Sequence, residues 1–316
     1  MQAVELCAGA GGQALGVETA GFEHAALVEI DKDCCDTLKQ NRSAWNVVND
    51  DLSNFDGRPF EGVELLAGGL PCPPFSIAGK QLGEKDERNL FPEGIRLIGE
   101  IRPKAVMFEN VRGILSSSFD EYRTYVTSEI EKLGYRVGWR LFNSADFGVP
   151  QSRSRVVMMA VRNSLSTSLP WPAPSLTPPP NVGETLVDLM AANGWTGAND
   201  WAAGANKPAP TIVGGSKKHG GPDLGPSRAK AAWAEMGVNG RSIANEPPSA
   251  DLQEMPRLTV RMVARLQGFP DEWKFAGKKT SSYRQVGNAF PPPVAAAVAK
   301  ALKDLIQAEE RKLATI

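Results

Sequence analysis

The chain has 316 residues, 42% of them hydrophobic and 22% charged, which suits a folded globular protein with one large domain and a smaller one. The net charge is −1, but it is unevenly distributed: residues 1–150 carry 15 basic and 23 acidic side chains, and residues 151–316 carry 20 basic and 13 acidic ones. A polyanion could bind the basic half, although chance clustering of charges on solvated faces gives the same numbers. No run of about 18 apolar residues occurs and the start of the chain has no signal-peptide features, so we expect no membrane segment.

Short apolar runs alternate with helix-like stretches over roughly the first half of the chain. This alternation indicates an α/β fold in which a parallel sheet is covered by helices on both faces. Helices are expected at 12–20 and 33–45, and strands are expected at 3–6, 25–30, 46–48, 63–67, 105–108 and 155–161.

The amino-acid composition changes near residue 164. Six of the eleven residues 170–180 are proline, which excludes a helix interior or a central strand and predicts a linker. From there to about residue 256 the chain is rich in Gly, Pro, Asn and Trp, so we expect an irregular, loop-rich module. Helical patterns return at 259–267 and 294–313.

A glycine turn, Gly9-Ala10-Gly11-Gly12, separates the first expected strand from the first helix. Glycines at such a turn let the backbone approach a ligand at a helix N-terminus. Glu29 ends the second strand 20 residues after Gly9, where a carboxylate can accept hydrogen bonds from a ribose. The pattern predicts an adenosyl ligand, but it also fits a nicotinamide or flavin cofactor, and a turn needed only for packing is the simpler alternative.

A proline-rich loop with one cysteine, Gly68 to Ser76, follows the fourth strand. Loops after strand C-termini face the ligand crevice of an open α/β sheet, so Cys72 stands where a nucleophile is useful. A lone cysteine is more often a packing residue. The letters CPPF also partly resemble the loop of amino-group methyltransferases, but those carry Asp, Asn or Ser at the position of Cys72.

Further polar candidates follow later strands. Glu109 ends the strand at 105–108 and can share the crevice with Cys72, unless it is an ordinary solvated residue. Alternation predicts that Gln151, Arg153 and Arg155 share one face of the next strand. Two guanidiniums on one face need acceptors, such as a base carbonyl, a phosphate or Glu109; a basic edge strand in water is the alternative.

The four cysteines all lie within the first 72 residues, and no secretory signal accompanies them. We therefore expect free thiols in a reducing compartment. His24 and His219 are not at ligand spacing from a cysteine pair, so no metal site is expected.

Taken together and in order, these motifs resemble the DNA (cytosine-5)-methyltransferase family over nearly the whole chain except about 164–256. One departure is Pro73, which stands where most members have Gln, so a phosphate contact at this position is in doubt. The matching segments are Glu5 to Gly12, Val28 to Asp31, Asp50 to Leu52, Pro71-Cys72, Asp86 to Phe91, Glu109 to Val111, Gln151 to Arg155, Arg257 to Arg261, Leu266 to Pro270, Gln285 to Ala289 and Pro292 to Val294.

The resemblance implies a Rossmann-like class I fold that uses S-adenosylmethionine and no metal, with a smaller, loop-rich target-recognition domain. Residues 1–165 and 283–316 would form the catalytic domain, and residues 166–282 the recognition domain and hinge. It implies that Cys72 adds to C6 of a flipped-out cytosine, that Glu109 engages N3 and the amino group, and that Arg155, supported by Arg153, holds O2.

The resemblance also implies two sets of binding residues. The cofactor, which leaves as S-adenosylhomocysteine, would contact Cys7, Gly9, Gly11, Gly12, Glu29, Ile30, Asp51, Leu52, Pro71 and Asn288, with Glu29 on the ribose and Asp51 on the adenine amino group. Double-stranded DNA would contact Ser76, Gln151, Thr211, Lys217, Lys218, Arg228, Lys230 and Arg241.

Three rival functions remain open from the sequence. The RNA branch of the same family would share the catalytic residues, although the variable module favours duplex DNA. A nucleotide-dependent oxidoreductase would explain the glycine turn but not the remaining groups. A catalytically inactive DNA-binding homologue conflicts with the complete catalytic set. We expect a monomeric bacterial or phage enzyme in the cytoplasm, for which a separately acting restriction endonuclease is a candidate partner.

Overall fold

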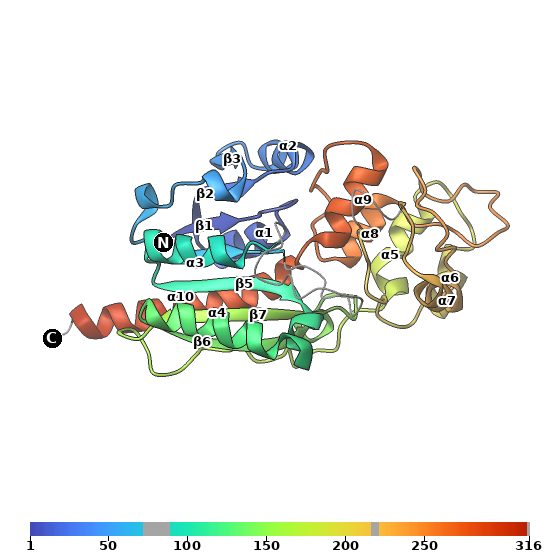
Figure 1. Ribbon diagram of the computed structural model, residues 1–316. Coiled ribbons are helices and arrows are strands. Elements are labelled where there is room, and N and C mark those ends of the chain that lie inside the picture. Colours follow the sequence, from blue (N-terminus) through green and yellow to red (C-terminus); the bar gives the residue numbers. More distant parts are fainter. Residues whose placement is uncertain (72–88, 216–220, 315–316) are drawn as a thin grey trace.

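The computed structural model describes residues 1–71, 89–215 and 221–314, and within these ranges one sheet runs through the larger part of the molecule (Figure 1). Every strand expected from the sequence is present, and β6 is an additional one. The strands are β1 (Gln2–Leu6), β2 (Glu23–Glu29), β3 (Val47–Asn49), β4 (Leu65–Gly68), β5 (Ala105–Val111), β6 (Tyr135–Asn143) and β7 (Ser154–Arg162), in the spatial order β3-β2-β1-β4-β5-β7-β6.

The sheet is mixed, not wholly parallel. Strands β3, β2, β1, β4 and β5 run parallel to their neighbours, as expected. Strand β7 runs antiparallel to both β5 and β6, so the expectation of a parallel sheet is wrong at this edge. The cause is the short connection over 144–153, which holds only one turn of 3₁₀ helix and is too short for the crossover that a parallel pair requires.

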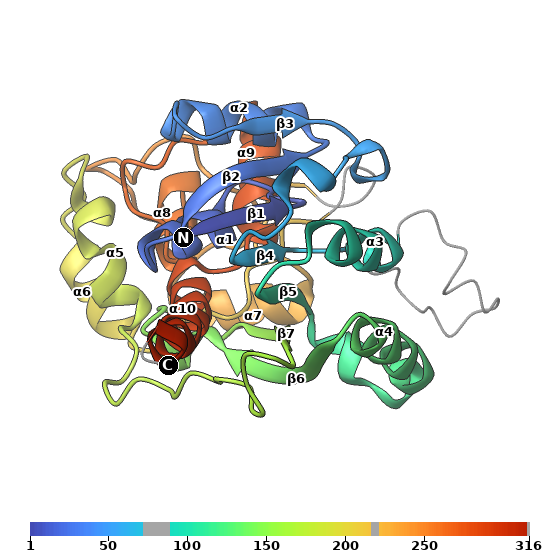
Figure 2. The ribbon, with the colours of Figure 1, turned by 90° about the vertical axis from the view of Figure 1, so that its left-hand side faces the viewer.

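Helices cover both faces of the sheet (Figure 2). Alternation along β1 places Val4 and Leu6 against α3 and α4, while Ala3 points to α1 and α10 on the opposite face. Helices α3 and α4 are additional to those expected from the sequence. The bounds are α1 (Gly12–Thr19), α2 (Lys32–Asn41), α3 (Phe91–Ile101), α4 (Asp120–Lys132) and α10 (Pro292–Ala314).

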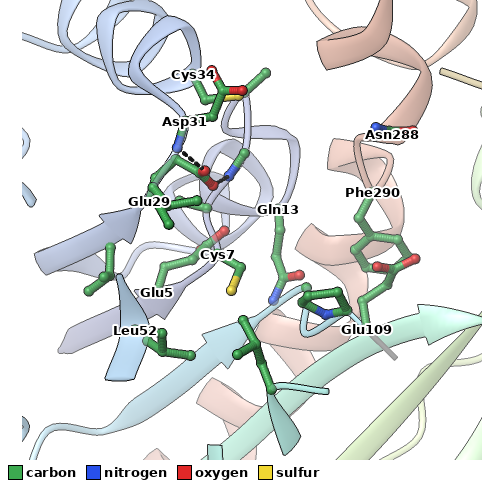
Figure 3. Close-up of a pocket in the computed structure, with 18 of the residues that line it drawn as sticks. Glu5, Cys7, Gln13, Glu29, Asp31, Cys34, Leu52, Glu109, Asn288 and Phe290 are labelled. Carbon is green, nitrogen blue, oxygen red and sulfur yellow. Dashed lines mark hydrogen bonds between the residues drawn. The ribbon is translucent and has the colours of Figure 1, made fainter. Parts of the chain in front are cut away.

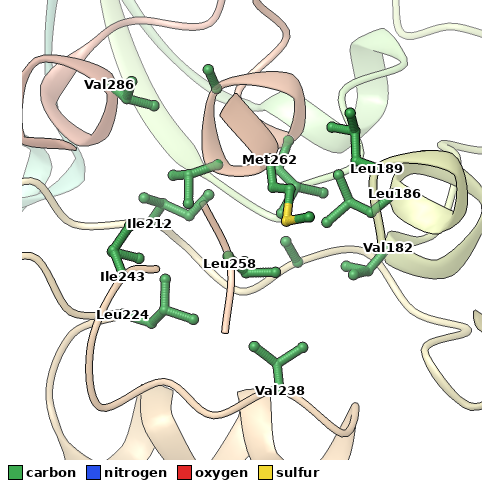
Figure 4. Close-up of a cluster of buried hydrophobic side chains, with 14 of the residues drawn as sticks. Val182, Leu186, Leu189, Ile212, Leu224, Val238, Ile243, Leu258, Met262 and Val286 are labelled. Carbon is green, nitrogen blue, oxygen red and sulfur yellow. The ribbon is translucent and has the colours of Figure 1, made fainter. Parts of the chain in front are cut away.

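A second module packs beside the sheet around its own hydrophobic cluster, part of which Figure 4 shows. Residues 164–180 hold neither helix nor strand, which agrees with the expected linker. The region after it is more regular than expected, because short helices form between its glycines and prolines. These helices are α5 (Val182–Ala191), α6 (Ala198–Gly204) and α7 (Ser227–Glu235), followed by α8 (Val260–Leu266) and α9 (Lys279–Asn288).

The sequence of helix α5 carries ordinary helix signals within this glycine- and proline-rich region. Asn181 and Glu184 form a reciprocal capping box at its start. The buried side chains of Val182, Leu186 and Leu189 then recur at helical spacing and pack into the second cluster. No helix among the described residues is both long and apolar enough to cross a membrane.

Gly16 lies where α1 crosses α10, and it provides a stability test. A Cβ atom at Gly16 would lie 2.4 Å from the carbonyl oxygen of Pro292 and 2.5 Å from the Cβ of Ala295. We expect Gly16→Ala to lower the free energy of unfolding by about 1 to 3 kcal/mol, because α10 must move away from α1.

The matched control is Gly99→Ala in α3, where the nearest atom to the new Cβ would be Leu133 Cδ2 at an ordinary 3.8 Å. This change should be neutral or add up to about 1 kcal/mol through helix propensity. Denaturant unfolding of both variants measures the difference, and equal effects would contradict the close α1–α10 contact.

Candidate active site

A cavity of about 1130 Å³ opens where the C-terminal ends of β1, β2, β4 and β5 meet the end of α9 (Figure 3). This is the edge at which ligands bind in open α/β sheets. Of the residues expected to hold a cofactor, the cavity is lined by Cys7, Gly9, Gly12, Glu29, Ile30, Asp51, Leu52, Pro71 and Asn288.

Two glycines of the glycine turn, Gly9 and Gly11, have different roles. Gly9 has positive φ and no atom within 4 Å of where a Cβ would lie, so its backbone is open to a ligand. Gly11, although expected to touch the cofactor, does not line the cavity: a Cβ there would lie 2.7 Å from Leu38 and 2.9 Å from Trp273. Gly11 therefore serves close packing.

Glu29 is held in place by backbone donors. One carboxylate oxygen accepts the N–H of Gly9 and the other accepts the N–H of Asp31, both at 2.7 Å. Burial raises the pKa of Glu29, and these two bonds oppose the rise. Because both oxygens keep further lone pairs, the carboxylate can still accept hydrogen bonds from a ligand in the cavity.

The cavity is also lined by an apolar and an acidic side chain, those of Ile30 and Asp51. Ile30 is 64% exposed and lines the cavity. Asp51 accepts hydrogen bonds from both the N–H and the hydroxyl of Ser53, and these bonds lower its pKa. The pair offers a flat apolar contact next to a charged acceptor, which suits a purine ring with an amino group.

Two buried polar side chains in the cavity are additional to the residues expected from the sequence. Glu5 is 1% exposed and Gln13 is 4% exposed, yet one carboxyl oxygen of Glu5 and the amide oxygen of Gln13 have no hydrogen-bond partner. Burial raises the pKa of Glu5 well above its usual value. A glutamate inside the otherwise apolar strand Ala3 to Leu6 is the sequence signal that could have revealed it.

Glu109 lines the same cavity and pairs with Arg155. Arg155 Nε lies 2.8 Å from Glu109 Oε1, and about 14% and 13% of the two side chains remain exposed. The antiparallel register of β5 and β7, which pairs Val111 with Arg155, brings them together. Burial raises the pKa of Glu109 even though Arg155 and Arg153 oppose the rise.

Gln151 and Arg153 stand just before strand β7, which begins at Ser154. Their sharing a face with Arg155 stays a prediction, but their side chains have partners other than Glu109. Both side chains are fully buried: Arg153 donates to the carbonyls of Ile212 and Gly287, and Gln151 donates to the carbonyl of Leu266. The expected DNA contact of Gln151 is contradicted by its burial.

The start of the proline-cysteine loop is anchored at the cavity. The side-chain amide of Asn110 donates to the carbonyl of Leu70 at 2.8 Å, and the N–H of Leu90 donates to the carbonyl of Pro71 at 3.3 Å. Pro71 and Leu90 both line the cavity. The expected nucleophile Cys72 and the expected DNA contacts Ser76, Lys217 and Lys218 lie outside the described residues.

The remaining expected DNA contacts belong to the second module. The hydroxyl of Thr211 donates to the carbonyl of Ser152 at 2.8 Å. Arg228 and Arg241 are exposed, whereas Lys230 pairs with Asp223 at 2.9 Å.

Comparison with known proteins gives concordant matches. The profile of the family described as C-5 cytosine-specific DNA methylase matches residues 1–304. The chain is 52% identical to Type II methyltransferase M.NaeI of Lentzea aerocolonigenes over 98% of this chain and 76% of that protein. It is 50% identical to Type II methyltransferase M.NgoMIV of Neisseria gonorrhoeae over 97% of this chain and 98% of that protein. A solved structure of a prophage-encoded DNA modification methyltransferase from E. coli has a TM-score of 0.70 at 23% identity, covering 97% of this chain and 99% of that one.

The buried carboxyl of Glu5 makes stability depend on pH in a predictable direction. Because its pKa is raised in the folded state, the native protein binds more protons than the unfolded one above the ordinary glutamate pKa of about 4.3, so its contribution to stability falls as pH rises. We expect the ligand-free Glu5→Gln variant to gain stability relative to wild type as pH rises from about 4.3.

Denaturant midpoints of both proteins, measured between acidic and mildly alkaline pH, test this. The informative quantity is the difference between the two curves. A difference that stays constant over the whole range would show that Glu5 titrates alike in the folded and unfolded chains.

Proposed function

The chain belongs to the C-5 cytosine-specific DNA methylase family and is a sequence-specific DNA (cytosine-5)-methyltransferase of the restriction-modification type, and on this premise we propose the reaction that its site performs. It transfers a methyl group from S-adenosylmethionine to C5 of a cytosine, through a transient covalent bond between Cys72 and C6. The observation that carries this proposal is that Glu109, paired with Arg155, lines the same cavity as the glycine turn and Glu29.

The residues present fit S-adenosylmethionine. Gly9 leaves room for close approach, the carboxylate of Glu29 can accept ribose hydroxyls, and Ile30 with Asp51 suits adenine. Glu5 and Gln13 also line the cavity, and one buried oxygen of each has no hydrogen-bond partner. When bound, the cofactor supplies an electrophilic methyl group on a sulfonium.

Cytosine C5 is a weak nucleophile because the ring is aromatic and electron-poor. When the thiolate of Cys72 adds to C6, it breaks the aromaticity and gives C5 the character of an enamine carbon, which can accept the methyl group. Loss of the C5 proton and expulsion of the thiolate then restore the ring. The anchored backbone at Pro71 supports this role, because Pro71 lines the cavity and Cys72 is the next residue.

Glu109 and Arg155 hold the edge of the cytosine. Burial raises the pKa of Glu109, so its carboxyl takes up a proton more readily and can deliver one to N3 as the ring becomes negative, while its oxygen accepts from the amino group. The guanidinium of Arg155 can donate to O2 while its Nε stays on Glu109. Both interactions strengthen as charge moves into the ring, so they stabilise the transition state more than the ground state.

C6 cannot be reached in a stacked duplex, so the target base must rotate out of the helix at a cost of a few kcal/mol. We assign residues 1–165 and 283–316 to the catalytic domain and residues 166–282 to recognition of the DNA sequence. Thr211 and the basic side chains of the second module, Lys217, Lys218, Arg228, Lys230 and Arg241, would contact the duplex.

The description of the matching family favours DNA over transfer RNA as the substrate. We propose that the enzyme acts as a monomer in the cytoplasm of a bacterial cell. There it would protect sites that a separate restriction endonuclease cuts.

The first test changes the nucleophile. We expect Cys72→Ser to abolish methyl transfer, because a serine hydroxyl is far less ionised than a thiol at neutral pH and adds poorly to C6. Tritium transfer from labelled S-adenosylmethionine to plasmid DNA measures activity, gel shift measures DNA binding, and transfer RNA serves as the alternative substrate. Binding should stay near the wild-type level.

A 5-fluorocytosine at the target position provides a second readout. The fluorine cannot leave as a proton does, so the wild-type enzyme should remain covalently attached to the DNA and survive denaturing electrophoresis, whereas Cys72→Ser should not. Wild-type turnover by the serine variant, or no trapped complex with active enzyme, would show that residue 72 is not the nucleophile.

A further inference from the structure

The segment 209–215 runs from the start of β7 to the end of α9 and is fixed at its first half to the catalytic domain. The N–H of Ala209 donates to the carbonyl of Pro150, and the N–H of Ser152 donates back to the carbonyl of Ala209, both at 2.8 Å. The N–H of Ile212 donates to the side chain of Gln151 at 2.9 Å. This segment therefore has a defined path rather than that of a free loop.

Arg153 ties this segment to the end of α9. Its guanidinium donates to the carbonyl of Ile212 at 2.6 Å and to those of Gly287 and Ala289 at 2.8 and 3.2 Å. Gln267 donates to the same carbonyl of Ala289 at 2.7 Å. A fully buried arginine that satisfies main-chain carbonyls from two segments fixes their separation, because losing either set leaves buried polar groups unpaired.

Two glycines make the contact between the segment and α9 unusually close. A Cβ at Gly287 would lie 2.4 Å from the backbone nitrogen of Gly214, and a Cβ at Gly214 would lie 2.5 Å from the carbonyl oxygen of Arg284. Neither glycine has positive φ, so the backbone conformation does not require them. What they share is that any side chain larger than the hydrogen of glycine would prevent the two backbones from lying this close.

The end of α9 is also a wall of the cofactor cavity. Asn288, Ala289 and Phe290 line it, and Figure 3 shows Asn288 and Phe290 on that side. The side-chain amide of Asn288 donates to the carbonyl of Gly215 at 3.3 Å. The same three-residue stretch thus faces the cofactor on one side and the segment 209–215 on the other.

We propose that Gly214, Gly287 and Arg153 are positioning residues that couple the cofactor cavity to DNA engagement through the segment 209–215. The proposal rests on the proposed function, since it takes S-adenosylmethionine and duplex DNA as the two ligands. A cofactor that orders residues 288–290 holds Gly214 and Thr211 in place, which favours DNA binding. By linkage, DNA bound at Thr211 strengthens cofactor binding by the same factor.

The test measures the coupling factor, the ratio of DNA dissociation constants without and with S-adenosylhomocysteine. The duplex carries the recognition site found by bisulfite sequencing of DNA from expressing cells. For the wild type we expect S-adenosylhomocysteine to tighten DNA binding at least about fivefold, within the usual range of coupling. In Gly287→Ala and in Gly214→Ala we expect less than about twofold tightening, because the new methyl group separates the two backbones.

Gly204→Ala in α6 is the matched control, since no atom lies within 4 Å of the position that its Cβ would take. This variant should keep the wild-type coupling factor and activity. The double variant Gly214→Ala/Gly287→Ala should lose little more coupling than either single one, because one methyl group already opens the contact. A variant that merely weakens the fold would lower the thermal midpoint and leave the coupling factor unchanged.

Hydrogen exchange on the wild type provides a readout that needs no variant. S-adenosylhomocysteine alone should slow exchange of backbone amides in 209–215. Unchanged exchange there, or wild-type coupling in both glycine variants, would overturn the positioning role. No binding of S-adenosylhomocysteine by the wild type, or no methylated cytosine, would instead refute the proposed function.

Discussion

The structure depends on one buried interaction, the ion pair between Glu109 and Arg155. Taking a carboxylate and a guanidinium out of water costs several kcal/mol, and a buried pair of this kind rarely adds net stability over packed apolar side chains. The antiparallel course of β7 places the two groups together, since in a parallel strand Arg155, near the start of β7, would lie beside the start of β5 and away from Glu109. A binding role explains the pair better than stability does, and we propose that it binds the edge of a cytosine.

Three other parts of the chain line the same cavity as Glu109. They are the β1–α1 turn with Glu29, the residues Pro71 and Leu90, which are hydrogen-bonded to each other, and the end of α9. The fold supplies this convergence because all of these groups follow the same edge of the sheet. The second module attaches where α9 ends, so the part that would read the DNA is joined directly to the wall of the cavity.

The sequence predicts the elements that have strong periodicity and fails where tertiary contacts decide. Strands β1, β2 and β4 and the glycine turn follow from apolar runs and spacing. Helix α5 lies among glycines and prolines and was obscured by composition, although its capping box and apolar stripe are visible in the letters. The different partners of Arg153 and Arg155 could not follow from alternation, because Arg153 donates to Ile212 and Gly287, which lie far along the chain. The burial of Gln151 depends on α8, more than a hundred residues further along the chain.

The most direct test is a double-mutant cycle on the pair, read by single-turnover methyl transfer to duplex DNA. If Glu109 and Arg155 act as one unit on the cytosine, Glu109→Gln and Arg155→Met should each slow transfer by about 100-fold or more, and the double variant should be no more than a few-fold slower than the slower single one. Losses that multiply, or a near-normal rate in either single variant, would contradict a shared role for the pair.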